Sequence, residues 1–163
     1  MYKFFCFLLL ALTYITCNKA FDVVCPAQDE NQGLVIQSFF DTEVSCFDES
    51  FMLNDLSEGL VIHTVDTYRS TIALVDLTGN ACVLPDIDFT QFTLLGLKTQ
   101  GTGCTRTYRR SVEAKGNGFE YEVTVRECGN CEPLEIRTHW VTIPKISEDA
   151  TVTFKIRTQK YNE

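Results

Sequence analysis

The chain has 163 residues, a net charge of −8 and 45% hydrophobic residues. This acidic balance excludes nonspecific attraction to nucleic acid or to an anionic membrane surface, because both favour clustered lysine and arginine. The length is that of a single domain that can bury a core of its own.

The first segment is typical of a secretory signal peptide. Lys3 supplies a positive charge, a run with almost no polar atoms extends from Phe4 to Ile15, and cleavage after Cys17 or Ala20 would follow. The run has about a dozen residues, whereas a helix that spans a bilayer needs about 20. We therefore expect a secreted, extracellular protein without stable insertion in a membrane.

This interpretation divides the chain into two parts. Residues 1–20 form the signal peptide and residues 21–163 form one secreted domain. Removal of the signal peptide takes away Lys3 and Lys19 but no acidic residue, so the net charge of the mature chain becomes −10.

Six of the eight encoded cysteines lie beyond the signal peptide. An even number of cysteines in a secreted chain indicates disulfide bonds, but the sequence leaves their pairing open. These cysteines are Cys25, Cys46, Cys82, Cys104, Cys128 and Cys131.

Cys128 and Cys131 form a C-x-x-C motif, which occurs in thiol oxidoreductases and in zinc sites. A redox motif stands at the start of a helix, whereas the residues on both sides of this one are strand-like. A zinc site needs a second matching pair, and Cys82 and Cys104 do not provide it. We expect structural disulfides here, with redox chemistry and a metal site as the alternatives.

The first third of the domain predicts short strands and a short helix. Residues 21–32 are polar and form an arm held by Cys25, and the apolar face of residues 51–56 predicts the helix. Apolar and β-branched residues predict three strands, at residues 34–40, 43–47 and 60–65.

Residues 70–88 give the densest strand-turn-strand pattern in the chain. A β-prone run begins at Thr71, Thr78-Gly79-Asn80 has turn chemistry, and a second apolar run around Cys82 ends at Pro85. This pattern predicts a hairpin, and residues 66–69 connect it to the preceding strand.

The next segment is less regular. Residues 89–97 fit neither the helical nor the strand period, and Gly96, Gly101 and Gly103 predict a flexible stretch that ends at Cys104. Residues 105–108 predict an edge or surface strand, and Gly116-Asn117-Gly118 predicts a turn.

The clearest alternation of apolar and polar residues lies at residues 119–126 and predicts a half-buried antiparallel strand. Residues 134–140 and 152–156 repeat the pattern, and Trp140 is expected in the core on the face of Leu134 and Ile136. The fold class is therefore mainly β: a single disulfide-stabilised antiparallel β-sheet domain with at most one or two short helices.

Catalytic signatures are absent from the sequence. His63 and His139 stand in predicted strands, but no G-x-S-x-G motif and no orienting acid accompany them. The carboxylate pairs Asp86/Asp88 and Glu120/Glu122 share strand faces, as acidic surface strands commonly do. We predict no catalytic residue, no metal site and no cofactor.

Arg106, Arg109 and Arg110 are the only local concentration of positive charge. They could bind an acidic ligand or a sulfated glycan. The alternative is a solvated edge whose arginines balance neighbouring acids.

The stretch VDTYRSTIALVDLTGNACVLPDID resembles the core of BRICHOS domains, in which an aspartate, here Asp66, precedes a β-prone run and a cysteine, here Cys82. The resemblance implies a bridge from Cys82 to Cys128, or else to Cys131, and chaperone-like binding of exposed β strands. Residues 152–156 would then be an intramolecular client. The chain also resembles, loosely, ependymin-related secreted proteins, which are β-rich and disulfide-bonded.

These observations predict a secreted, disulfide-bonded binding or interaction protein without catalysis, whose partner is an extracellular protein or a small ligand. The BRICHOS-like chaperone is a specific version of this function. The alternatives are a small secreted hydrolase that uses His63 or His139 with a nearby acid, and a thiol oxidoreductase at Cys128 and Cys131.

Overall fold

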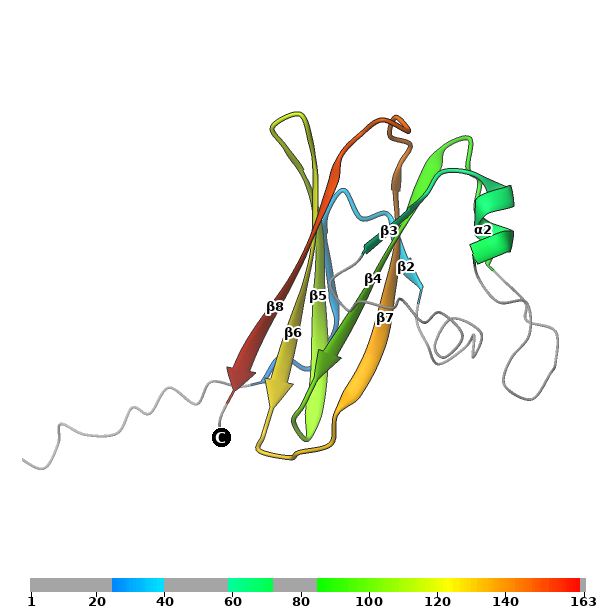
Figure 1. The fold of residues 1–163 in the computed structure, drawn as a ribbon. Coiled ribbons are helices and arrows are strands. Elements are labelled where there is room, and N and C mark those ends of the chain that lie inside the picture. The colour runs from blue at the N-terminus through cyan, green and yellow to red at the C-terminus, as the bar shows by residue number, and fades with distance from the viewer. Residues whose placement is uncertain (1–24, 40–58, 72–84, 162–163) are drawn as a thin grey trace, which may run out of the picture.

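The computed structural model describes residues 25–39, 59–71 and 85–161. These residues form eight strands and one short helix, and the strands make two four-stranded sheets (Figure 1). The elements are β1 (Glu30–Gly33), β2 (Gln37–Phe39), β3 (Gly59–Ile62), α2 (Val65–Thr71), β4 (Phe92–Gly101), β5 (Thr105–Lys115), β6 (Gly118–Cys128), β7 (Glu135–Pro144) and β8 (Val152–Tyr161).

The strand order is β1-β5-β6-β8 in the first sheet and β2-β7-β4-β3 in the second. Most neighbouring strands are antiparallel, but β1 runs parallel to β5 and β8 runs parallel to β6. The mainly β class with a short helix is confirmed. The two parallel pairs were not predicted, because strand direction depends on long connections that leave no local pattern in the sequence.

The main core lies between the two sheets. Tyr121, Val123 and Val125 of β6 are fully buried, and they face a layer from β4 and β7 that includes Leu95 and Val141. This arrangement confirms the alternation predicted at residues 119–126. The turn predicted at residues 116–118 is also confirmed, because Gly116 has φ 60° between the paired ends of β5 and β6.

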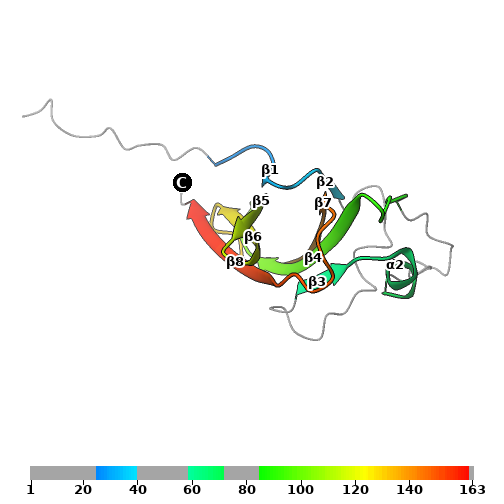
Figure 2. The same cartoon turned by 90° about the horizontal axis from the view of Figure 1, so that it is seen from above.

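A second, smaller core covers the outer face of the second sheet. Trp140 packs there with Leu94, Ile62 and Tyr68, and α2 lies on this side of the molecule, away from the first sheet (Figure 2). Gly96 makes room for the tryptophan, because a Cβ atom at this position would lie 2.4 Å from the Trp140 ring.

The prediction that Trp140 lies in the core is confirmed, but part of its basis is wrong. Leu134 and Ile136 are 59% and 48% exposed, so the buried part of β7 begins only beyond them.

Helix α2 begins after Thr64, whose hydroxyl accepts a hydrogen bond from the Thr67 amide at 3.2 Å. Asp66 in the first turn and Arg69 in the last turn match the helix dipole.

The hairpin predicted at residues 70–88 is wrong at its start, because Thr71 ends helix α2. Residues 72–84, and with them the rest of the hairpin, lie outside the described residues.

Three other predicted elements differ from the structure. The strand predicted at residues 34–40 is confirmed only in β2, Gln37–Phe39, because residues 34–36 connect β1 to β2 after Gly33, which has φ 67°. The strand predicted at residues 60–65 is confirmed but ends at Ile62. The strand predicted at residues 43–47 and the helix predicted at residues 51–56 lie outside the described residues.

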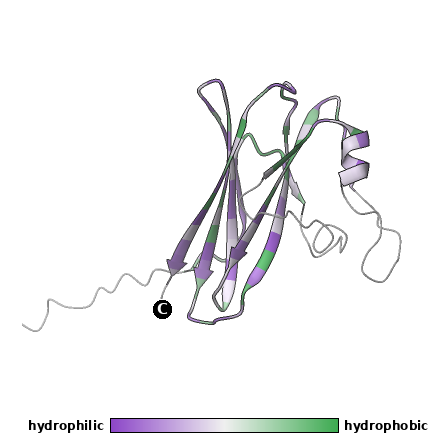
Figure 3. Ribbon diagram, in the orientation of Figure 1, coloured by the Kyte–Doolittle hydropathy of each residue, from purple (hydrophilic) through white to green (hydrophobic). Residues whose placement is uncertain are grey.

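The predicted flexible stretch around Gly96 is wrong, because β4 passes through it. The strand predicted at residues 105–108 is confirmed as the first part of β5, and these residues pair with β6 alone, because β1 pairs with β5 only from Arg109 on. In β4 tertiary pairing decides the conformation rather than the local pattern. The C-terminal ends of strands β4, β6 and β8 are hydrophilic, as Figure 3 shows. Among the described residues, no helix is long and apolar enough to cross a membrane.

Candidate functional site

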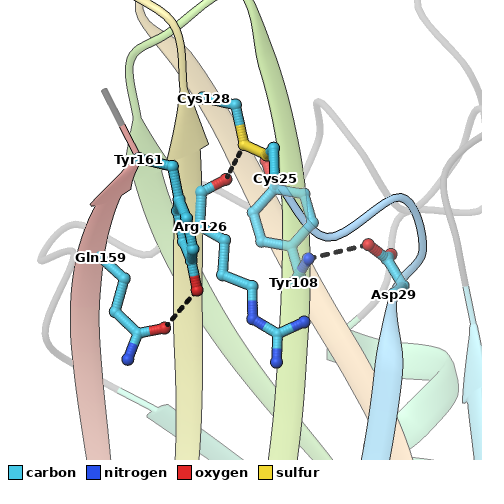
Figure 4. The surroundings of a disulfide bond; sticks show 7 residues. All are labelled: Cys25, Asp29, Tyr108, Arg126, Cys128, Gln159 and Tyr161. Atoms are coloured by element: carbon cyan, nitrogen blue, oxygen red, sulfur yellow. Dashed lines mark hydrogen bonds between the residues drawn. A yellow bond between two sulfur atoms is a disulfide. The ribbon is translucent and has the colours of Figure 1, made fainter. Parts of the chain in front are cut away.

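Both cysteines of the C-x-x-C motif are bonded to distant parts of the chain. Cys128 pairs with Cys25 (Figure 4), and Cys131 pairs with Cys104. The motif therefore contains no dithiol that could cycle between its own two sulfurs.

This pairing corrects one implication of the sequence. A BRICHOS-like bridge from Cys82 to Cys128 or Cys131 is wrong, because both candidate partners are already bonded to other cysteines. Cys46 and Cys82 themselves lie outside the described residues. The client segment implied by the resemblance, residues 152–156, is the first half of β8 and pairs with β6.

The N-terminal arm, residues 25–33, is attached to the first sheet at several points. Besides the Cys25 bridge, Glu30 binds the guanidinium of Arg126 through two hydrogen bonds of 2.9 Å. These bonds hold the pKa of the Glu30 carboxyl below its usual range and raise the pKa of Arg126. The arm thus shields Arg126, a buried arginine on the outer face of β6 (Figure 4).

A chain of polar side chains crosses the interior between the two sheets. Asp29 of the arm accepts a hydrogen bond of 3.0 Å from Arg110, and Arg110 Nε donates to His139 Nδ1 at 3.3 Å. His139 Nε2 lies 2.8 Å from the hydroxyl of Thr99. Arg110, His139 and Thr99 are almost fully buried, so the two sheets are joined by a hydrogen-bonded network as well as by apolar contacts.

The hydrogen bonds of this network define the protonation state of His139. Arginine Nε can only donate, so Nδ1 of His139 must accept, and Nε2 donates to Thr99. Burial, followed by the charges of Arg110 and Arg137, holds the pKa of His139 well below its usual value. A neutral, enclosed imidazole with both nitrogens engaged suits a structural role rather than that of a general base.

Tyr108 covers this network on the β5 side. Its ring centroid lies 4.5 Å from that of His139, and the Arg137 guanidinium lies 5.2 Å from the tyrosine ring. Burial, and next the charge of Glu135, raises the pKa of Tyr108 to about 12. The phenol is therefore protonated throughout the physiological range.

The three arginines predicted as a possible ligand site do not form one patch. Arg106 and Arg110 point to the inner face of β5, where they pair with Glu135 and Asp29. Arg109 points to the outer face and pairs with Glu122 at 3.7 Å. Of the three, only Arg109 has a substantially exposed side chain, at 30%.

The outer face of the first sheet carries rows of alternating charge. Glu120 on β6 binds Lys115 of β5 at 2.9 Å and Lys155 of β8 at 2.6 Å. Glu122 binds Arg157 of β8 at 2.6 Å, beside Arg109. All of these residues except Lys155 line a hollow of about 310 Å³, which we call the charged hollow. Its lining consists of Gln32, Arg109, Ser111, Glu113, Lys115, Glu120, Glu122 and Arg157.

The other carboxylate pair and the second histidine have local roles. Asp88 accepts hydrogen bonds from the amide and hydroxyl of Thr90 and from Gln91, which lowers the pKa of its carboxyl. His63 follows β3, and its carbonyl accepts a hydrogen bond of 2.7 Å from Lys145. Burial, and then the charge of Lys145, lowers the pKa of His63.

Most partners of the internal network leave no local signal in the sequence. Asp29, Thr99 and Glu135 lie far along the chain from the arginines and the histidine that they contact, so they could not be predicted as its members. The sequence signal that could have found the network is the break in the apolar faces of β5 and β7 at Arg110 and His139. Within the described residues, no cluster of histidine, cysteine or acidic side chains is arranged to hold a metal ion.

Comparisons with known proteins found no match to a family model, to a curated protein or to a solved structure.

Proposed function

We propose that this chain is a secreted, disulfide-bonded binding protein without catalysis. The observation that carries the proposal is the division of Cys128 and Cys131 between two bridges to distant cysteines. Such bridges stabilise a scaffold in an oxidising compartment, and they leave the C-x-x-C motif without a redox pair. The hydrogen bonds around His139 support the same interpretation, because they use both ring nitrogens within the core.

The binding site that we propose is the charged hollow, and its ligand is acidic. Arg109 and Arg157 retain 30% and 63% of their side-chain exposure although both contact Glu122. Each guanidinium therefore has free surface for a further carboxylate or sulfate group. This proposal narrows the predicted arginine site to Arg109, since Arg110 is buried and Arg106 is 10% exposed.

A binding experiment tests this function. The secreted chain is titrated with a sulfated oligosaccharide and with soluble poly-glutamate, and we expect that Arg109→Gln weakens binding about threefold or more. Arg69→Gln is the matched control, because it removes the same charge from the exposed surface of α2. Equal loss in both variants, or no binding of either polymer, would overturn the ligand class.

A redox assay tests the absence of catalysis. Denaturation without reductant is expected to reveal no free thiol at Cys128 or Cys131, and the protein is expected not to catalyse the reduction of insulin by dithiothreitol. Catalysis above that of a heat-treated sample would instead support the oxidoreductase alternative. The chaperone function remains a prediction, which delay of fibril growth of a β-prone peptide would test.

A further inference from the structure

Strand β8 forms one edge of the first sheet and is its longest edge strand. It extends over ten residues, whereas β1 at the other edge has four. In the part of the chain that the structure describes, β8 pairs with β6 alone. The unpaired N–H and C=O groups of such an edge are a template for one more strand.

The charges of the sheet specify what that strand should carry. Glu30 of β1, Arg109 of β5, Thr124 of β6 and Arg157 of β8 stand in one row across the four strands. Glu122, two residues before Thr124, contacts both Arg109 and Arg157, so negative and positive charges alternate across the sheet. The next position beyond Arg157 therefore favours a carboxylate.

The remaining side chains of β8 favour the same kind of partner. Its sequence, VTFKIRTQKY, contains no acidic residue, and on the outer face Lys155 and Arg157 retain 42% and 63% of their side-chain exposure. On the inner face of the strand, Ile156 is 39% exposed, and the Lys160 side chain, near the end of the strand, is 70% exposed. A second copy of β8 is a poor partner for this edge, because pairing would bring cations together.

We propose that the edge of β8 that is unpaired among the described residues binds an extended segment of a partner protein in which acidic and apolar residues alternate. The backbone of the segment pairs with β8, its carboxylates contact Lys155 and Arg157 on the outer face, and its apolar side chains cover Ile156 on the inner face. This inference rests on the proposed function, since it names the partner class for the same charged face. The competing explanation is that the cations only protect the edge against unwanted pairing.

The experiment uses the full secreted chain and two fluorescent, end-blocked peptides, one of alternating glutamate and valine and one of alternating lysine and valine. We expect the glutamate peptide to bind with an affinity that falls as salt rises, and the lysine peptide not to bind. Hydrogen exchange of the β8 amides should slow only in the complex with the glutamate peptide.

Two variants that remove the same charge locate the site. Lys155 lies on the edge strand, whereas Arg69 lies on the exposed surface of α2, outside the first sheet. Lys155→Gln should weaken binding of the glutamate peptide about threefold to tenfold, whereas Arg69→Gln should change it less than twofold, about the experimental error. Equal effects of the two variants would contradict an edge site.

Four other outcomes would overturn the proposal. The first three are failure of the glutamate peptide to bind, equal binding of both peptides, and binding without protection of the β8 amides. The fourth is slow exchange of the β8 amides in the free protein, because another segment or a second copy would then already cover the edge. If poly-glutamate or the sulfated oligosaccharide still binds through Arg109 while the peptide fails, the proposed function stands and only the edge site is lost.

Discussion

Arg110 and Asp29, which are 81 residues apart in the chain, form an ion pair of 3.0 Å between a buried guanidinium and a carboxylate of the N-terminal arm. The arginine side chain is 1% exposed and the aspartate is 35% exposed. This pair connects the arm to the network that reaches His139 in the opposite sheet. The arm is therefore part of the domain's internal structure as well as an edge strand.

Neutralising Asp29 should destabilise the protein more than neutralising its neighbour. Asp29→Asn leaves the buried Arg110 charge without its carboxylate, and we expect a loss of about 2 kcal/mol in the free energy of unfolding. Glu30→Gln, the control, should cost less than Asp29→Asn, because the Glu30 side chain is 44% exposed. Urea unfolding of both variants measures the difference, and equal losses would contradict a special role for Asp29.

Stability should fall between pH 6.5 and pH 5 because of His139. The pKa of this group is lowered in the folded state, so below its usual value of 6.5 the unfolded chain binds a proton that the folded chain does not. The contribution of the neutral His139 side chain to the free energy of unfolding is fully present above pH 6.5. As the pH falls below this value, the free energy of unfolding decreases by at most about 1.4 kcal/mol per pH unit.

His139→Gln is the variant that isolates this effect, because its amide can accept from Arg110 and donate to Thr99 but does not titrate. The pH dependence of the urea midpoint should be flatter for the variant than for the wild type in this interval. Identical profiles would contradict a lowered pKa of His139 in the folded protein.

A second loss of stability should occur in acid because of Glu120. Hydrogen bonds from Lys155 and Lys115 lower the pKa of its carboxyl from 4.5, so the stabilisation is present above this value and is lost as the pH falls through the lower, folded-state pKa. Glu120→Gln should reduce this acid-dependent loss. Ser111→Ala, the control, changes a neighbouring residue that does not titrate and should leave the acid-dependent loss of stability unchanged. A wild-type acid profile in the Glu120 variant would show that this loss does not come from Glu120.

Gly96 should not tolerate a side chain while Trp140 is present. Gly96→Val places a Cβ atom 2.4 Å from the indole ring, and we expect a loss of about 1 to 3 kcal/mol with a shift in tryptophan fluorescence. Trp140 is the only tryptophan, so the emission reports this site alone. Gln100→Ala on the exposed part of β4 should change neither the free energy of unfolding nor the tryptophan emission.

Combining Gly96→Val with Trp140→Leu should recover part of the loss in the free energy of unfolding. Strict additivity of the two changes would contradict the steric explanation.

The sequence predicted best those features that depend on local periodicity. The alternation at residues 119–126 specified the buried face of β6, and Gly116-Asn117-Gly118 specified the turn before it. The β class followed from several such strands. These predictions succeeded because the inner face of a half-buried strand must be apolar whatever its partners are.

Features that depend on distant contacts could not be predicted from the sequence. Strand β1 is short, polar and exposed, and only its pairing with β5 makes it a strand. Gly96 and Gly101 were expected to be flexible, yet β4 needs Gly96 beneath Trp140. The three adjacent arginines were considered as one site, but alternation in β5 sends Arg109 to one face and Arg106 and Arg110 to the other.

A disulfide map of the protein, made by mass spectrometry after digestion without reduction, tests the bonding of the two motif cysteines on which the proposed function depends. We expect peptides that join Cys25 to Cys128 and Cys104 to Cys131. A bridge between Cys128 and Cys131 would contradict the proposed function, because the C-x-x-C motif would then be a redox pair and the arm would lose its covalent attachment to β6.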